Sequence, residues 1–150
     1  MDDQDYQRLL EMRTGLRRFL RWSEDQARGA GLTPAQHQLL LAVRGHPDPR
    51  GPSVGDVAEY LLLRHHSAVG LIDRAEAAGL VRRIPDPENL STVRLRLTPE
   101  GALKLEALSE LHLEELAHLA PTMQALWDAL EQPGDGDGRE PHPAAAPRQR

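Results

Sequence analysis

The chain has 150 residues and a net charge of −5, with 39% apolar residues, 27% charged residues and no cysteine. These values are typical of one ordinary soluble domain, and they exclude disulfides, thiolate zinc sites and cysteine redox switches. The sequence has no run of about 18 apolar residues to span a membrane, and its acidic start differs from a secretory signal, so we expect a cytoplasmic protein.

A long first helix is predicted over residues 5–28. Apolar residues recur at helical spacing from Tyr6 to Leu20, and Gly29 and Gly31 mark the end of the pattern. One solvated side of this helix carries four arginines, namely Arg13, Arg17, Arg18 and Arg21. They are either an ordinary charged helix face or residues that contact DNA or a second subunit.

A second helix is predicted over residues 34–44. Thr33 and Gln36 have the spacing of a capping box, and Pro34 occupies the first helical position between them. The apolar residues Leu39, Leu40 and Val43 should face the core. Residues 45–52 then predict a loop, since they contain Pro47, Pro49, Gly51 and Pro52.

Two short helical patterns follow, joined by a tight turn. The first begins after Ser53, a favourable N-cap residue, and the second ends at Gly79, where a helix commonly needs a left-handed residue. Residues 64–67 lie at the start of the second pattern. This arrangement predicts a helix-turn-helix, whose second helix can lie in the major groove of DNA.

Residues 80–97 predict two strands around a polar turn. In the second strand, apolar residues from Val93 to Leu97 alternate with Arg94 and Arg96, so one face covers the core and the other presents guanidinium groups. A hairpin in this position is the wing of a winged helix-turn-helix, which we place at about residues 33–98.

The remaining sequence predicts two more helices and a tail. Thr98, Pro99 and Glu100 favour a helix start, and leucines continue the apolar pattern to Leu119. Pro121 should break the helix, leaving a short last helix that ends before Pro133. We therefore predict a mainly α (α+β) single domain over residues 1–131, with long terminal helices at about 5–28 and 99–131 and a disordered tail at 132–150.

Six short segments, in this order and spacing, resemble the MarR family of bacterial transcriptional regulators. They are Leu32-Thr33-Pro34-Ala35-Gln36, Val57-Ala58-Glu59-Tyr60-Leu61, Ser67-Ala68-Val69 with Asp73-Arg74, Gly79-Leu80-Val81-Arg82-Arg83, Asp86-Pro87-Glu88 and Leu97-Thr98-Pro99-Glu100-Gly101. The likeness covers roughly residues 5–131.

The resemblance implies a homodimer in which the terminal helices of two subunits interlock. It also implies binding to a pseudo-palindromic operator in double-stranded DNA, with one recognition helix in each half-site. Members of the family usually repress transcription. Many release DNA when a small, often aromatic or phenolic, ligand enters the cleft between the dimer helices and the winged part. The lack of cysteine excludes the peroxide-sensing branch of the family.

The residues expected to contact DNA lie on the second helix of the motif and on the wing. Small side chains on that helix allow a close approach to base edges, and His65 and His66 offer hydrogen bonds. The predicted set is Arg64, His65, His66, Ser67, Ala68, Gly70, Leu71, Arg74, Arg82, Arg83, Asn89, Arg94 and Arg96.

The wing tip departs from the family pattern. Asn89, Leu90 and Ser91 stand where the family has Asp-Arg-Arg, whose arginine enters the minor groove with help from the acid. The wing arginines of this chain lie on the strands instead, where contact with phosphates is expected. The departure predicts weaker, more salt-sensitive binding, with most of the specificity in the major-groove helix.

Three alternatives stay open at this point. His65 and His66 could bind a metal, although adjacent helix residues point to different sides and no cysteine accompanies them. Arg74 could form a structural salt bridge. The near-neutral charge of the reading region also fits a winged-helix protein-interaction module with little DNA affinity. The sequence has no glycine-rich phosphate loop, nucleophile elbow or His-Glu metal helix, so we expect no enzyme and no cofactor.

Overall fold

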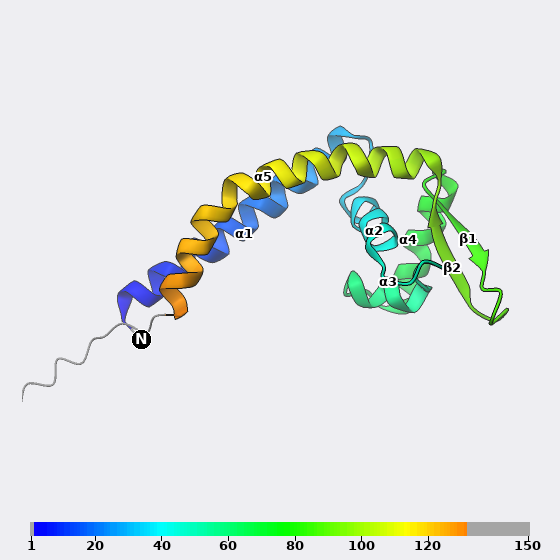
Figure 1. Ribbon diagram of the computed structural model, residues 1–150, viewed down its shortest axis with the longest axis horizontal. Helices are drawn as coiled ribbons and strands as arrows, with labels where there is room; N and C mark the ends of the chain where they lie inside the picture. Colours follow the sequence, from blue (N-terminus) through cyan, green and yellow to red (C-terminus); the bar gives the residue numbers. More distant parts are fainter. Residues whose placement is uncertain (1, 132–150) are drawn as a thin grey trace, which may run out of the picture.

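The structure, a computed structural model, describes residues 2–131. In chain order its elements are α1 (Asp3–Gly29), α2 (Pro34–Gly45), α3 (Val54–Tyr60), α4 (His65–Ala77), β1 (Val81–Pro85), β2 (Val93–Leu97) and α5 (Pro99–Glu131). Figure 1 shows that α1 and α5 lie side by side in a long arm, while α2, α3, α4 and the β1–β2 hairpin form a compact part at one end. This is the mainly α, winged helix-turn-helix arrangement that the sequence predicts.

Three helices begin with reciprocal capping boxes. In each, the side chain of the N-cap residue accepts a hydrogen bond from a backbone N–H in the first turn, and the side chain at that position accepts one from the N-cap N–H. The predicted box of α2 joins Thr33 to Gln36, and corresponding boxes join Ser53 to Asp56 in α3 and Asp2 to Asp5 in α1. The starts of these helices are therefore specified locally.

The core lies where α2, α3, α4, the hairpin and the first turns of α5 meet. Its fully buried side chains include Leu39 and Leu40 from α2, Ile72 from α4 and Leu95 from β2. These contacts hold α4 against the hairpin and against α2, so one side of α4 is fixed in the core and the other faces solvent.

The turn of the helix-turn-helix has an unusual backbone. After α3, Leu62 adopts a φ of 54°, and the N–H of Leu63 donates to the carbonyl of Ala58. Left-handed geometry normally favours glycine, and a leucine in that geometry is uncommon. Leu62 is also 92% exposed, so no burial of its side chain offsets the strain. At the other end of α4, Gly79 has the predicted left-handed conformation, with a φ of 73°.

The wing is an antiparallel hairpin in which Val81 lies opposite Leu97 and Pro85 lies opposite Val93. The loop before α3 packs along the free edge of β2, where the N–H of Leu95 donates to the carbonyl of Pro52. Gly51 in this loop has a φ of 90°, and a Cβ atom there would lie 2.1 Å from the Leu95 carbonyl oxygen. Only glycine fits, so the loop and the wing are held in fixed contact.

The arm meets the compact part at a cluster of rings. A 2.6 Å hydrogen bond joins His112 Nε2 of α5 to the hydroxyl of Ser23 on α1. The His112 ring lies 4.9 Å from that of Trp22 and 4.8 Å from that of His37 on α2. Burial, followed by the proximity of His112, lowers the pKa of His37 from its usual value. The cluster therefore joins α1, α2 and α5 at one point.

The predicted break at Pro121 is wrong, because α5 runs without interruption from Pro99 to Glu131. An internal proline removes one backbone hydrogen bond and costs a helix about 3 kcal/mol. Apolar residues on both sides of it, Leu119 and Met123, are half-buried and line a groove against α1. Packing on both sides of the proline offsets its cost, which explains why the helix continues.

No helix of residues 2–131 combines the length and the apolar character that crossing a bilayer requires. The tail predicted at 132–150 lies outside the described residues.

Candidate nucleic-acid interface

The outer side of α4 presents a small, polar surface to solvent. His65 and His66 are exposed in its first turn, and Ser67 and Gly70 are partly exposed beside them. Arg64 is the N-cap residue, and its exposed side chain makes no capping hydrogen bond. The structure therefore brings these five predicted residues together at the beginning of one helix.

Two other predicted residues of α4 do not belong to this surface. Ala68 is fully buried and Leu71 is 3% exposed, because both lie on the side of the helix that packs with Ile72 in the core. The expectation that they contact DNA is corrected: they fix the helix, and its other side is available for contact.

Arg74 lies over the middle of the exposed side of α4. A Cβ atom added to Gly70 would be 3.3 Å from Arg74 Nη1, so the guanidinium folds back across the glycine. Within the described residues Arg74 makes no ion pair, and the structural salt bridge considered for it is absent there. Its charge is therefore available at this surface.

Arg83 has a different position from the one predicted. From β1 its guanidinium reaches two acids of α4, at 2.9 Å from Glu76 Oε1 and in direct contact with Asp73. The pKa of Glu76 is lowered, first because the backbone N–H of Arg83 donates to it and then because the guanidinium does. Arg83 therefore neutralises the acidic residues Asp73 and Glu76 of α4, and its guanidinium is turned toward them and not outward.

A buried carboxylate holds the base of the wing. Asp86 is 1% exposed, and its Oδ2 accepts a 2.9 Å hydrogen bond from Arg94 Nε, with Arg50 Nη1 at 3.6 Å. The pKa of Asp86 is lowered, mainly because the N–H of Glu88 donates to it and secondly because Arg94 does. Arg50 also pairs with Asp48 and Glu88. This cluster ties the hairpin to the loop before α3.

The predicted phosphate contact of Arg94 is therefore corrected. Its side chain is only 17% exposed and lies between Asp86 and the loop that carries Gly51. The period-two alternation of β2 correctly placed it off the core face, but the loop that covers this face could not be read from strand periodicity.

We predict that Asp86→Asn lowers the stability of the wing, because the largely covered Arg94 would lose its 2.9 Å carboxylate partner and keep only Asp56, whose Oδ2 lies 3.9 Å from its Nη1. The folded-state pKa of Asp86 is depressed. The stability that this carboxylate contributes is therefore present above about pH 5 and is lost as the pH falls below about 4. Melting temperatures of the two proteins should differ at pH 7 and converge toward pH 3. A difference independent of pH would contradict this assignment.

Two wing arginines do face solvent. Arg82 and Arg96 lie directly opposite each other on the two strands, and both are exposed. Like charges in this cross-strand position repel, so the pair favours an anion between or above them. At the tip, the Asn89 side chain accepts hydrogen bonds from the N–H and the hydroxyl of Ser91, while Leu90 is 82% exposed. The cationic part of the wing is its strands and not its tip.

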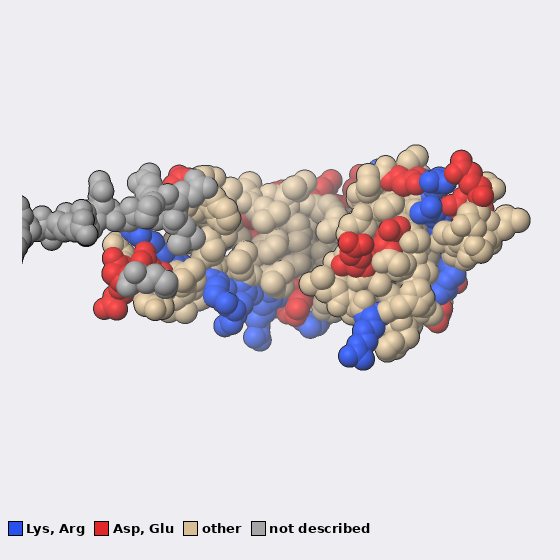
Figure 2. Space-filling model, turned by 90° about the horizontal axis from the view of Figure 1, so that it is seen from below, with Lys and Arg blue, Asp and Glu red and all other residues tan. Residues whose placement is uncertain are grey.

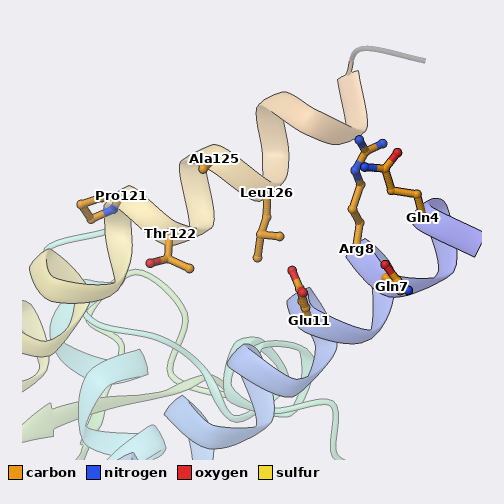
Figure 3. A pocket seen from close by; sticks show the side chains of 8 residues that line it. All are labelled: Gln4, Gln7, Arg8, Glu11, Pro121, Thr122, Ala125 and Leu126. Carbon is orange, nitrogen blue, oxygen red and sulfur yellow. The ribbon is translucent and has the colours of Figure 1, made fainter. Parts of the chain in front are cut away.

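The described part of the chain is hollowed in several places, of which three bear on the site and the arm. One of about 740 Å³ lies between α2, the following loop, β2 and α5, with Arg44, His46 and Arg96 in its wall. A groove of about 670 Å³ between α1 and α5 is lined by apolar residues such as Leu10 and Phe19. Figure 3 shows the third, about 580 Å³, where α1 side chains from Gln4 to Glu11 face α5 near its end.

The possible metal site is not supported by any cluster of ligands. Across residues 2–131, no three His, Cys, Asp or Glu side chains gather in a way that could hold an ion.

Comparison with known proteins gives concordant findings. The MarR family model matches residues 30–89. The transcriptional activatory protein BadR of Rhodopseudomonas palustris is 27% identical over 123 residues, which are 73% of this chain and 70% of that protein. The MarR family transcription regulator SP03579 superposes with a TM-score of 0.70 at 22% identity, over 86% of this chain and 83% of that one. The transcriptional repressor CouR, in a complex with a 23-mer DNA duplex, has a TM-score of 0.63 at 24% identity, over 81% and 87%.

Proposed function

Because this chain belongs to the MarR family of winged helix-turn-helix transcriptional regulators, we propose that it binds a pseudo-palindromic operator as a homodimer. One α4 lies in the major groove of each half-site, about 10 base pairs from the other. The observation that carries this proposal is the exposed side of α4. It presents to solvent His66, Gly70 and Arg74, which pairs with no acid among residues 2–131, while the acids of the same helix are neutralised by Arg83.

The wing contributes phosphate contacts through Arg82 and Arg96. Contacts of this kind position a protein on DNA but do not read its sequence. The uncharged tip at Leu90 adds no cation for the minor groove. Sequence specificity is accordingly assigned to α4.

Footprinting on DNA upstream of the gene tests the proposed operator binding. Two protected half-sites of related sequence are expected, and one unpaired site or none would contradict the proposal.

The arm supports the proposed dimer. Large apolar side chains are exposed along both of its helices, among them Leu10 at 66%, Leu20 at 56% and Leu113 at 68%. Together with the apolar groove between α1 and α5, they form more unburied apolar surface than a small soluble monomer usually leaves in water. A second copy of the arm covers it.

We further propose that the dimer represses transcription and releases DNA when a small ligand enters the hollow between α5 and the winged part. This hollow touches both α5 and the β2 strand that carries Arg96, so an occupant contacts the arm and the wing at once. Its wall carries Arg44 and Arg96 together with the acids Asp48 and Glu106, so a ligand there would meet both signs of charge, with the arginines as the partners for a carboxylate or phenolate. Displacement of labelled operator by a panel of aromatic carboxylates and phenols tests the ligand. Lower transcription after deletion of the gene would assign activation instead.

Gly70→Ala should separate stability from function. Alanine is favoured over glycine in a helix interior by about 1 kcal/mol, and the new methyl group meets only the flexible end of Arg74, at 3.3 Å. The variant should therefore melt higher. It should bind operator about tenfold more weakly, since a methyl group separates the helix from the base edges. Gly55→Ala on α3, where the nearest atom is 3.7 Å away, should leave operator affinity unchanged.

Ser91→Arg should tighten binding, because it places a cation at the wing tip. One added phosphate contact makes the fall of log affinity with log salt concentration steeper by about 1. Titrations of operator and of random DNA at several salt concentrations measure this slope. An unchanged slope would mean that the tip does not approach DNA.

A further inference from the structure

The outer faces of α1 and α5 carry opposite charges at matching intervals. On α1, Arg13, Arg17 and Arg21 recur every four residues and are exposed. On α5, Glu106, Glu110 and Glu114 recur every four residues and are also exposed. Residues four apart lie about 6 Å apart along a helix, so each set forms a stripe about 12 Å long. Figure 2 shows Lys and Arg side chains gathered along one edge of the arm.

Neither stripe has a partner within the described part of the subunit. Among residues 2–131, the side chains of the three arginines and the three glutamates make no ion pair or hydrogen bond, although the arm holds other pairs such as Arg28 with Glu24. Own-chain packing between α1 and α5 uses different sides of the two helices, where Phe19, Trp22 and His112 meet. The stripes are therefore outside the contact that already exists.

Each stripe lies beside exposed apolar residues. On α1 the arginines flank Leu16 and Leu20, which are 47% and 56% exposed, and on α5 the glutamates flank Leu113, which is 68% exposed. An apolar seam with charges along its borders is the pattern by which paired helices select partner and register. A surface of this composition fits another helix with the opposite charge at its border.

We propose that the arginine stripe of α1 pairs with the glutamate stripe of α5 from a second copy of this chain. The inference rests on the proposed homodimer and names the contact that sets its register. The two-fold symmetry of a dimer makes this contact twice, because α1 of each subunit meets α5 of the other. The pairing excludes alignments in which α1 meets α1, since arginines would then face arginines.

Reciprocal charge reversal tests the pairing. One variant carries Arg13→Glu, Arg17→Glu and Arg21→Glu, and the other carries Glu106→Lys, Glu110→Lys and Glu114→Lys. Each variant alone brings like charges together, and its dimer dissociation constant should rise by about a hundredfold, measured by sedimentation at low salt. An equimolar mixture of the two should form a heterodimer of wild-type affinity, because both contacts in it are attractive.

Several outcomes separate the possibilities. If both variants dimerise as the wild type does, the charge pairing is overturned. It is also overturned if both variants are folded by circular dichroism but do not associate with each other when mixed. A variant with all six changes should again form homodimers, and its failure to do so also contradicts the pairing. Reversal of the arginines that weakens DNA binding without changing dimerisation assigns the stripe to DNA. If the wild type itself is monomeric, the proposed dimer fails, and that result is distinct from the others.

Discussion

Ser67→Glu is expected to abolish operator binding while leaving the protein folded. Ser67 occupies the third position of α4, at the partly exposed border of the reading surface. A glutamate in the first turn of a helix is favourable, because it faces the positive end of the helix dipole. Against DNA, the same carboxylate meets phosphates and base acceptors, which repel it. Such like-charge contacts cost several kcal/mol, which is a loss of affinity of about a hundredfold or more.

Ser67→Gln is the matched control for this experiment. Glutamine has nearly the same size and shape as glutamate but no charge, so it should weaken operator binding far less. Fluorescence anisotropy with a labelled operator compares the three proteins, and melting temperatures verify that each is folded. Equal affinities for the wild type and the glutamate variant would mean that α4 does not read DNA.

Leu16→Glu combined with Leu20→Glu should convert the dimer into a monomer. Both leucines are about half exposed on the free side of α1, so neither contributes to the core of its own subunit. In the proposed dimer they would be covered, and two carboxylates on this apolar seam would cost several kcal/mol in lost apolar contact and in desolvation. Loss of the dimer removes one of the two half-site contacts, and operator affinity should fall by about a thousandfold.

The control for this double variant is Leu90→Glu. Leu90 is an even more exposed leucine, but it lies in the turn between β1 and β2, and Figure 1 shows this hairpin at the end of the molecule away from the arm. This change should leave the dimer mass unchanged in light scattering. A double variant on α1 that still has the mass of a dimer would show that the arm is not the site of association.

The elements of the fold that local chemistry specifies could be predicted from the sequence. The capping box of Thr33 and Gln36, the left-handed Gly79 and the alternating residues of β2 all occur as predicted. Each depends on residues within a few positions of one another. The helix break predicted at Pro121 is wrong because it also rests on local sequence alone. The helix-breaking tendency of this proline is local, whereas the packing of Leu119 and Met123 against α1 comes from distant sequence.

The candidate site was predicted less completely than the fold. The early residues of α4 form a surface as expected, but helical spacing alone did not separate Ala68 and Leu71 from their exposed neighbours. The positions of Arg83 and Arg94 depend on acids that lie on other elements, Asp73 on α4 and Asp86 at the end of β1. A charged residue on a strand predicts an exposed side chain. Whether a carboxylate from another element pairs with it can be seen only in the tertiary structure.

The central claim is that a dimer of this chain recognises a two-part DNA site through α4. The most direct measurement is the mass and affinity of its complex with upstream DNA, by light scattering and by titration against random DNA of equal length. We expect one dimer per duplex, and an affinity for the specific site that exceeds the affinity for random DNA by about a thousandfold. A monomer that binds both DNAs equally weakly at all salt concentrations would contradict the central claim, and would favour a winged-helix module that binds another protein.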